Sequence, residues 1–270
     1  MDALRLLKDK VVVITGASSG IGAGTAVLFA RHGCRLVLAG RNAGNLERTR
    51  AECLEVGDGL RPDQVIAVTG SVEEEKDCEK LIRAAVDTFG RLDVLVNNAG
   101  MAVRGTAASL ELAEFDSQMK TNVSSVFLLS KLALPHLAST KGSIVNVSSV
   151  VGFRSAVNSL AYSTSKAAVD HLTRNLALEF AGRGVRVNGV SPGLIVTEFQ
   201  KRAGMPEDVY EKFIAAAAEA NPSGRVGLPE HVANAILFLA SDMALHVTGS
   251  SVTVDGGASL GSQAALPARP

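Results

Sequence analysis

The sequence predicts an α/β protein, a single domain with a doubly wound, Rossmann-like parallel sheet. The first observation is that short apolar runs, such as Val11–Thr15, alternate with longer segments that have a helical pattern. The second is that these runs are apolar throughout, as strands covered on both faces are. The third is that the intervening segments are long enough for right-handed helical crossovers between parallel strands.

Each element follows from its local pattern. Strands are expected where apolar and β-branched residues run together, at Val11–Thr15, Arg35–Ala39, Val65–Val68, Val94–Asn97, Ser143–Ser148, Arg186–Ser191 and Ser251–Val254. Helices are expected where apolar residues recur at helical spacing, at Ile21–His32, Leu46–Glu55, Glu73–Phe89, Glu114–Leu137, Tyr162–Ala181 and Glu230–Ala240.

One domain is expected over residues 1–270, because no linker, repeat or low-complexity segment divides the chain and 47% of its residues are hydrophobic. The core of this domain is expected to cover 8–260. Segment 194–225 lies between a strand and the next regular helix, and we interpret it as a helical flap over the substrate. Segment 261–270 has small residues and two prolines and is expected to be a flexible tail.

Composition argues against several classes of partner. The 27 basic and 27 acidic residues leave no basic excess, so nucleic acid is not an expected partner. No apolar run approaches the ~20 residues that span a bilayer, and residues 1–10 do not have the pattern of a secretory signal. Cys34, Cys53 and Cys78 lack the spacing of a disulfide framework or a zinc site, and the histidines show no ligand spacing. We therefore expect a cytoplasmic protein without a metal or a membrane partner.

Glycines occur where the first strand turns into the first helix, in a G-x-x-x-G-x-G pattern. They permit a tight turn, and the helix N-terminus offers free N–H groups and positive potential to a pyrophosphate. This spacing differs from the G-x-G-x-x-G fingerprint and, taken alone, also fits a purely structural turn. Its place at the first βα turn favours a dinucleotide cofactor, bound by Gly16, Ser18, Ser19, Gly20, Ile21 and Gly22.

The end of the second strand indicates which dinucleotide is used. NAD enzymes place a carboxylate there for the ribose hydroxyls, but this sequence has Gly40 followed by Arg41. A guanidinium suits a 2′-phosphate, so NADP(H) is favoured over NAD(H). The alternative is that Arg41 only solvates the strand end. Asn97–Gly100, at the end of the fourth strand, suits a ligand crevice and equally fits a polar turn.

A tyrosine and a lysine in the second half of the chain suggest catalysis. Tyr162 and Lys166 lie four residues apart, on one face of an expected helix, and Ser149 follows the fifth strand. A free tyrosine has a pKa of about 10, and a nearby ammonium group lowers it. A tyrosine tuned in this way can exchange a proton with a substrate oxygen as a hydride moves. From the pattern alone, Tyr162 is equally well explained as a residue of the helix surface.

These motifs together resemble the short-chain dehydrogenase/reductase family. They occur in the family's order and spacing over roughly 8–260, at Thr15–Gly22, Asn97–Gly100, Asn122, Ser149, Tyr162, Lys166 and Pro192–Gly193. The resemblance implies a nicotinamide-dependent oxidoreductase that interconverts a carbonyl and a secondary alcohol. It also implies a homotetramer or homodimer built on the helices Glu114–Leu137 and Tyr162–Ala181 and on the C-terminal strand.

The resemblance also implies a role for each matching residue. Tyr162 would be the general acid or base, and Lys166 would lower its pKa and bind the nicotinamide ribose. Ser149 would hydrogen-bond the substrate oxygen, and Asn122 would hold a water that relays protons to Lys166. Further cofactor contacts would come from Ser71, Val72, Asn98, Ala99, Gly100, Pro192, Gly193, Ile195 and Thr197. Ser71 departs from the family pattern, which has an aspartate there, so the bond to adenine would be weaker.

We therefore expect an NADP(H)-dependent oxidoreductase for a small substrate. A lipophilic one, resembling a 3-oxoacyl group or a steroid, is suggested by Val151, Phe153, Val157, Leu194, Phe199, Met205 and Phe213. The same side chains could instead pack the flap. One alternative is an NAD-dependent alcohol dehydrogenase of the same family. Another is a non-catalytic dinucleotide-binding protein, which is disfavoured because both Tyr162 and Lys166 are present.

Overall fold

The computed structural model describes residues 7–57 and 59–261, so the expected tail lies, apart from Gly261, outside the described residues. The strands are β1 (Val11–Thr15), β2 (Arg35–Gly40), β3 (Val65–Thr69), β4 (Val94–Asn97), β5 (Ser143–Val147), β6 (Arg186–Pro192) and β7 (Ser251–Val254). The helices are α1 (Gly20–Arg31), α2 (Ala43–Val56), α3 (Glu75–Phe89), α4 (Leu112–Met119), α5 (Ser125–Thr140), α6 (Leu160–Ala181), α7 (Phe199–Arg202), α8 (Glu207–Ala220) and α9 (Pro229–Ala240).

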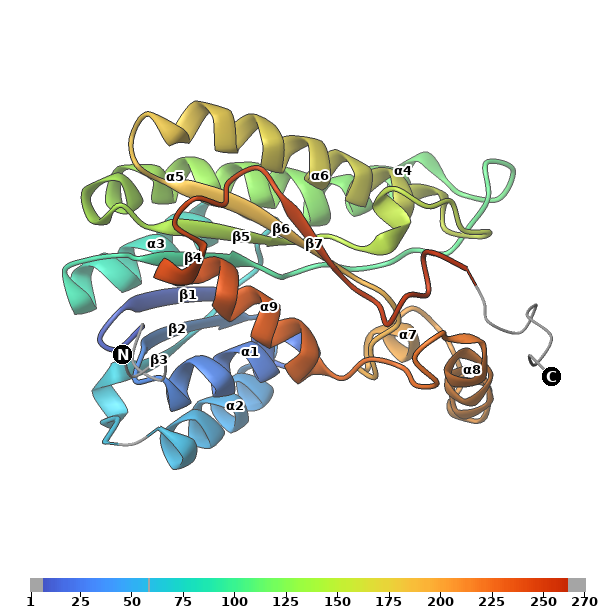
Figure 1. Ribbon diagram of the computed structural model, residues 1–270, viewed down its shortest axis with the longest axis horizontal. Helices are drawn as coiled ribbons and strands as arrows, with labels where there is room; N and C mark the ends of the chain where they lie inside the picture. The colour runs from blue at the N-terminus through green and yellow to red at the C-terminus, as the bar shows by residue number, and fades with distance from the viewer. Residues whose placement is uncertain (1–6, 58, 262–270) are drawn as a thin grey trace, which may run out of the picture.

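All described strands pair in parallel, in the order β3-β2-β1-β4-β5-β6-β7. Helices cover both faces of this sheet, with α1, α2 and α9 on one side and α3, α5 and α6 on the other (Figure 1). The strand order reverses between β1 and β4, which is where open α/β sheets bind ligands. The doubly wound fold expected from the sequence is therefore confirmed.

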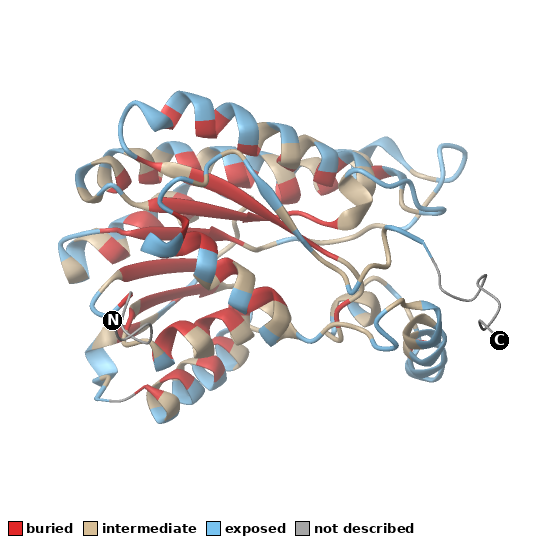
Figure 2. Cartoon of the chain, in the orientation of Figure 1, coloured by how far each residue is buried: buried red, intermediate tan, exposed pale blue. Residues whose placement is uncertain are grey.

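Burial on both faces of the sheet explains why the strands appear in the sequence as continuous apolar runs. Every residue of β1 and of β5 is buried, because helices pack on both faces of the central sheet (Figure 2). Phe29 of α1 and Ile236 of α9 belong to one apolar core, whereas Leu129 of α5 and Phe180 of α6 belong to the other. Among the described helices, none combines the length and apolar character needed to cross a membrane.

The helix expected at Glu114–Leu137 is interrupted. Helix α4 passes into a π-helical turn at Lys120–Ser124, and α5 then continues to Thr140. Such turns are often found at functional sites, and this one contains Asn122. The periodicity of apolar residues indicated the helix but did not reveal this local change of pitch.

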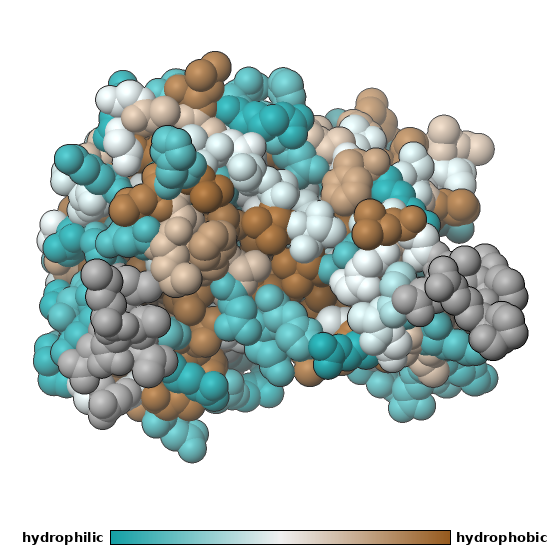
Figure 3. Space-filling model, in the orientation of Figure 1, coloured by the Kyte–Doolittle hydropathy of each residue, from teal (hydrophilic) through white to brown (hydrophobic). Residues whose placement is uncertain are grey.

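Segment 194–225, here called the flap, carries α7 and α8 beyond the carboxyl ends of the strands (Figure 1). The base of the flap is closed by a parallel bridge between Ile195 and Gly227. Val196 N–H donates to the Gly227 carbonyl at 2.9 Å, and Gly227 N–H donates to the Leu194 carbonyl at 3.0 Å. Hydrophilic side chains gather on the outer surface of α8 (Figure 3). The two chain segments at the base of the flap therefore lie side by side.

At the opposite end of the sheet, a buried carboxylate joins β1 to β4. Asp93 is only 2% exposed and accepts a hydrogen bond from Val11 N–H at 2.9 Å. The guanidinium of Arg91 donates two hydrogen bonds to it, at 2.9 and 2.6 Å, and Lys10 Nζ lies 3.5 Å away. The carboxylate thus fixes the first residues of two neighbouring strands.

Replacing this carboxylate tests how much that junction contributes. We expect Asp93→Ala to lower the free energy of unfolding by about 3 kcal/mol, because the Val11 amide and two cations lose their partner. Urea unfolding followed by circular dichroism measures the change. Asp63→Ala, which removes an exposed carboxylate paired with Arg61, should leave the midpoint unchanged. A loss for Asp93→Ala as small as that of the control would contradict the prediction.

Candidate active site

A cavity of about 510 Å³ opens at the carboxyl ends of the strands, where the strand order reverses. The structure brings most of the expected site residues to its wall, namely Gly16, Ser18, Ser19, Gly20, Ile21, Arg41, Ser71, Val72, Asn98, Ala99, Gly100, Ser149, Tyr162, Lys166, Pro192, Gly193, Ile195 and Thr197. Two expected residues, Gly22 and Asn122, do not line it. Both lie directly behind the wall and shape it from there.

The glycine-rich turn depends on two close approaches. Gly16 has a φ of +65°, in the left-handed region that favours glycine. A Cβ atom on Gly22 would lie 2.3 Å from the Gly16 carbonyl oxygen, so only glycine lets α1 begin so close to the turn. The first N–H groups of α1 then face the cavity and give it positive potential. Gly22 therefore supports the expected dinucleotide site from behind.

A threonine that the sequence reasoning left out of the site joins the two halves of the sheet at this point. Thr15 Oγ1 accepts hydrogen bonds from the backbone N–H groups of Asn98 and Ala99, both at 3.0 Å. In return, Asn98 Nδ2 donates to the Thr15 carbonyl oxygen at 2.8 Å. Asn97–Gly100 is consequently held against the glycine-rich turn, and its small residues line the cavity.

Ser71, where the family pattern has an aspartate, is held in a local turn. Its N–H donates to Asp77 Oδ2 at 2.8 Å, and its hydroxyl accepts a hydrogen bond from Glu73 N–H at 3.3 Å. Part of its accepting capacity is therefore already used within the chain. Weaker binding of adenine by Ser71 remains a prediction. Glu73, which also lines the cavity, was not expected from the sequence.

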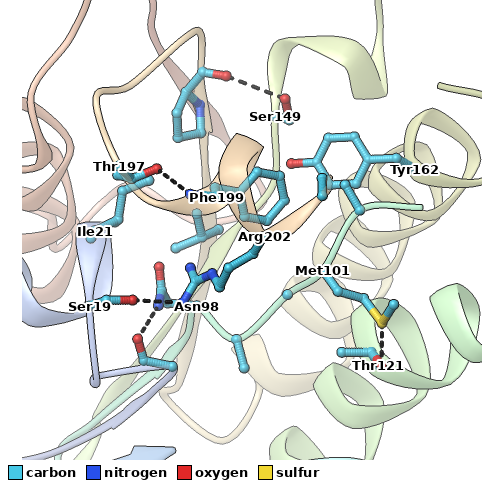
Figure 4. Close-up of a pocket in the computed structure, with 18 of the residues that line it drawn as sticks. Ser19, Ile21, Asn98, Met101, Thr121, Ser149, Tyr162, Thr197, Phe199 and Arg202 are labelled. Atoms are coloured by element: carbon cyan, nitrogen blue, oxygen red, sulfur yellow. Dashed lines mark hydrogen bonds between the residues drawn. The ribbon is translucent and has the colours of Figure 1, made fainter. Parts of the chain in front are cut away.

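Three of the four residues expected to be catalytic, Ser149, Tyr162 and Lys166, come together from the end of β5 and from α6. Ser149 follows β5, and its hydroxyl donates to the Pro192 carbonyl at 3.4 Å. The hydroxyl of Tyr162 is turned toward Ser149 (Figure 4). One turn further along α6, Lys166 Nζ lies 5.6 Å from the Tyr162 ring centroid and donates to the Val147 carbonyl at 2.7 Å. A substrate oxygen between Ser149 and Tyr162 would meet two hydroxyl groups.

Burial dominates the acid–base properties of the pair. It raises the pKa of Tyr162 to about 12, against the lowering effect of the Ser149 hydroxyl. It also lowers the pKa of Lys166 to about 8, against the opposing effect of Asp170. The pKa of Tyr162 therefore moves in the direction opposite to the one expected from the sequence. The reason is that removing the phenolate from water outweighs the hydrogen bond from Ser149.

Asn122 supports the site through its side chain. Its Oδ1 accepts a hydrogen bond from Met101 N–H at 2.9 Å, and its Nδ2 donates to the Met101 carbonyl and to Ser165 Oγ, both at 3.0 Å. These bonds hold the segment after β4 against α6, beside Lys166. A water relay through Asn122 stays a prediction.

The apolar side chains expected in the substrate pocket divide into two groups. Val151, Leu194 and Phe199 line the cavity, and the Phe199 ring lies 5.6 Å from the ring of Tyr162. Phe153 and Val157 instead project into solvent, with 60% and 89% of their surface exposed. Met205 and Phe213 also lie away from the cavity wall. The residues that line it without having been expected there include Met101 and Arg202.

We also searched the described residues for side chains that could bind a metal ion. Among residues 7–57 and 59–261, no three His, Cys, Asp or Glu side chains gather in a way that could hold an ion. The polar groups on the side chains that line the cavity include hydroxyl groups, an ammonium group, two guanidinium groups and a carboxylate.

Comparisons with known proteins agree with this geometry. The family described as enoyl-(acyl carrier protein) reductase matches residues 16–259. A 3-oxoacyl-[acyl-carrier-protein] reductase of Thermotoga maritima is 38% identical, covering 93% of this chain and 98% of that protein. A meso-2,3-butanediol dehydrogenase of Serratia marcescens is 37% identical, covering 93% of this chain and 94% of that protein. The solved structure of a short-chain dehydrogenase/reductase of unknown function from Caenorhabditis elegans, with cofactor, superimposes with a TM-score of 0.91 at 39% identity, covering 96% of this chain and 98% of that one.

The buried ammonium group of Lys166 gives a pH-dependent prediction. Its pKa is about 8 in the folded chain and ordinarily 10.5, so the unfolded chain holds the proton more tightly. Protonation therefore destabilises the fold fully below pH 8, and this effect disappears as the pH rises above 10.5. We expect Lys166→Met to raise the free energy of unfolding at neutral pH by about 2 kcal/mol. That figure is a gain of about 3 offset by about 1 for the lost bond to Val147.

Denaturant unfolding at a fixed protein concentration, repeated from neutral to alkaline pH, measures the difference between Lys166→Met and the parent chain. The difference should shrink as the pH rises. Lys212→Met, which removes an exposed ammonium group from α8, serves as the matched control and should show no such trend. A Lys166→Met variant less stable than the parent at neutral pH would contradict the prediction.

Proposed function

The chain belongs to the short-chain dehydrogenase/reductase family, oxidoreductases that act on CH–OH groups, and from this premise we propose that it interconverts a lipophilic ketone and its secondary alcohol with NADP(H). One observation carries the proposal. A single cavity joins the glycine-rich turn that suits a dinucleotide to the Ser149, Tyr162 and Lys166 side chains that suit proton transfer.

The residues present fit a nicotinamide dinucleotide. The free N–H groups at the start of α1 would bind its diphosphate, and Lys166 would bind the nicotinamide ribose. The nicotinamide would border Pro192, Gly193, Ile195 and Thr197. When bound, the nicotinamide supplies or accepts the hydride. The small residues of Asn97–Gly100 leave room for the cofactor beside the strand ends.

Proton transfer falls to the chain itself. Ser149 would donate a hydrogen bond to the substrate oxygen, and Tyr162 would transfer its phenolic proton to that oxygen as the ketone is reduced. A pKa of about 12 keeps Tyr162 protonated near neutral pH, as reduction requires. The charge of Lys166 would stabilise the phenolate that remains after the transfer. This arrangement supports reduction as the favoured direction near neutral pH.

The preference for NADP(H) is inferred from the adenosine end of the cavity. Arg41 follows β2, lines the cavity and makes no ion pair among the described residues. No acid stands at the end of β2 to bind ribose hydroxyls. A guanidinium without a partner at this position suits a 2′-phosphate.

A lipophilic substrate is supported by what surrounds Tyr162. Met101, Val151, Leu194 and Phe199 all line the cavity together with the tyrosine. Apolar side chains contribute affinity in such pockets, whereas a few polar groups fix orientation. The relatives differ in their named substrates, from a 3-oxoacyl-[acyl-carrier-protein] to meso-2,3-butanediol and cis-4-hydroxycyclohexanecarboxylate, but each of these three names denotes a reductase or a dehydrogenase.

The assembly and location of the chain are also proposals. A homotetramer or homodimer is supported by large apolar side chains exposed on α4, α5 and α6, where Leu112 is 74%, Phe127 51% and Leu178 83% exposed. A cytoplasmic location is supported by three free, buried cysteines, whose thiol pKa values burial raises.

The role of Tyr162 can be tested by removing one oxygen atom. We expect Tyr162→Phe to lower kcat by about 10²–10⁴-fold, because the substrate oxygen loses its proton donor, while the affinity for NADPH changes far less. NADPH consumption with a carbonyl substrate found by screening measures kcat, and calorimetry measures the affinity. Tyr210→Phe removes the only other phenol of the chain and should cost much less. Equal losses in the two variants would contradict the assignment.

The cofactor preference can be tested by titration. We expect the parent chain to bind NADPH about tenfold more tightly than NADH, and Arg41→Ala to lose that margin because the 2′-phosphate loses its partner. If NADH binds equally or better, Arg41 is only a surface charge and the NAD-dependent alternative holds. If neither nucleotide binds, the enzyme proposal itself fails.

A further inference from the structure

The flap reaches across the cavity and contacts the glycine-rich turn. Arg202, the last residue of α7, donates from Nη1 to Ser19 Oγ at 2.9 Å, over a sequence separation of 183 residues. Ser19 precedes the first residue of α1, so this contact lies at the positive N-terminus of that helix. Figure 4 shows the Arg202 guanidinium between α7 and Ser19. A cation is thus placed at the point where the helix already favours an anion.

Other residues hold α7 in place. Lys201 Nζ lies 3.3 Å from Glu198 Oε1 and 2.8 Å from Glu207 Oε1, and it lies over the ring of Tyr210 at 4.8 Å. Tyr210 in turn donates its hydroxyl to the Thr197 carbonyl at 3.1 Å. These contacts join α7 to α8 without Arg202. The side chain of Arg202 is therefore not needed to build the flap.

Arg202 shares the cavity with a second cation. Arg41 also lines it. Partial burial lowers the pKa of Arg202, Glu198 opposes this shift, and the charge of Arg41 adds to it. Neither guanidinium makes an ion pair within residues 7–57 and 59–261. The carboxylate that lines the cavity, Glu73, accepts a hydrogen bond from Thr121 Oγ1 at 2.8 Å. Two like charges that face one cavity repel each other, and an anion bound between them would offset this repulsion.

The hydrogen bond to Ser19 does not by itself account for this placement. A guanidinium has five N–H donors, and in the described chain Arg202 uses one of them. The remaining donors lie in a planar fork that matches two oxygens of a phosphoryl group. The flap thus presents an arginine with unused donors to the mouth of a cavity that suits a dinucleotide.

We propose that Arg202 is a cofactor-binding residue whose guanidinium binds a phosphoryl group of the dinucleotide from the flap side. The inference rests on the proposed function, because it requires that the cavity take a dinucleotide. Two phosphoryl groups fit the position: the diphosphate bridge at the start of α1, and a 2′-phosphate near Arg41. The chemistry is the same for both, and the experiment distinguishes them.

The test is calorimetric titration of NADPH, NADH, ADP and 2′,5′-ADP into the full chain and its variants. Arg202→Gln should weaken binding by about tenfold, as expected for loss of hydrogen bonds to a charged group. If the diphosphate is the partner, NADPH, NADH and ADP weaken by similar factors. If the 2′-phosphate is the partner, NADPH and 2′,5′-ADP weaken and NADH does not.

Two further variants show whether the effect of Arg202 comes from its charge, from its planar donor fork or from the overall charge of the flap. Arg202→Lys keeps the charge but not the fork, and should recover part of the affinity. Lys212→Gln removes an exposed cation from α8 of the same flap, and should bind every nucleotide as the parent does. The affinity of Arg202→Gln should also depend less on salt, since one screened charge contact is gone.

The outcomes are distinguishable from failure of the proposed function. If the parent chain binds no dinucleotide, the proposed function is wrong. If the parent binds and folded Arg202→Gln, checked by circular dichroism, binds all four nucleotides equally well, the role of Arg202 is overturned. An equal loss in Lys212→Gln would also overturn it, because the effect would then come from the general charge of the flap.

Discussion

The hydrogen bonds between the ends of β1 and β4 position everything else in the cavity. Thr15, buried to 1% exposure, accepts from two backbone amides after β4, and Asn98 donates back to the end of β1. The parallel pairing of β1 with β4 reaches the Ile14–Val96 pair, and these side-chain hydrogen bonds hold the strand ends together just beyond it. This one small cluster therefore holds the glycine-rich turn at a fixed distance from the wall that carries Gly100 and Lys166.

The proposed catalytic pair, Tyr162 and Lys166, shows how burial in this fold shifts the pKa values of ionisable groups. Lys166 is buried and Tyr162 is half-buried, so each is pushed toward its neutral form. The Lys166 ammonium group therefore lowers the stability of the fold, and the Tyr162 phenol stays protonated. Active sites commonly give up stability in this way, because they must stabilise a charge that appears only during the reaction.

The sequence was sufficient to predict the layered fold, because buried parallel strands such as β1 and β4 are apolar throughout and need no long-range information. It also identified most of the cavity wall, since glycines and small residues at strand ends carry local signals. Three features depended on tertiary structure. The π-helical turn around Asn122 leaves apolar periodicity nearly unchanged, the pKa of Tyr162 depends on burial, and the contact between Arg202 and Ser19 joins residues 183 positions apart.

The closed base of the flap has a consequence for how such enzymes diversify. Because Ile195 and Gly227 lie side by side, the flap leaves and re-enters the body at one place. Insertions or deletions in α8 would leave the register of β6 and β7 unaltered. New substrate ranges can thus arise by changing the outer part of the flap, while residues near its base, such as Thr197, keep their place in the cavity wall.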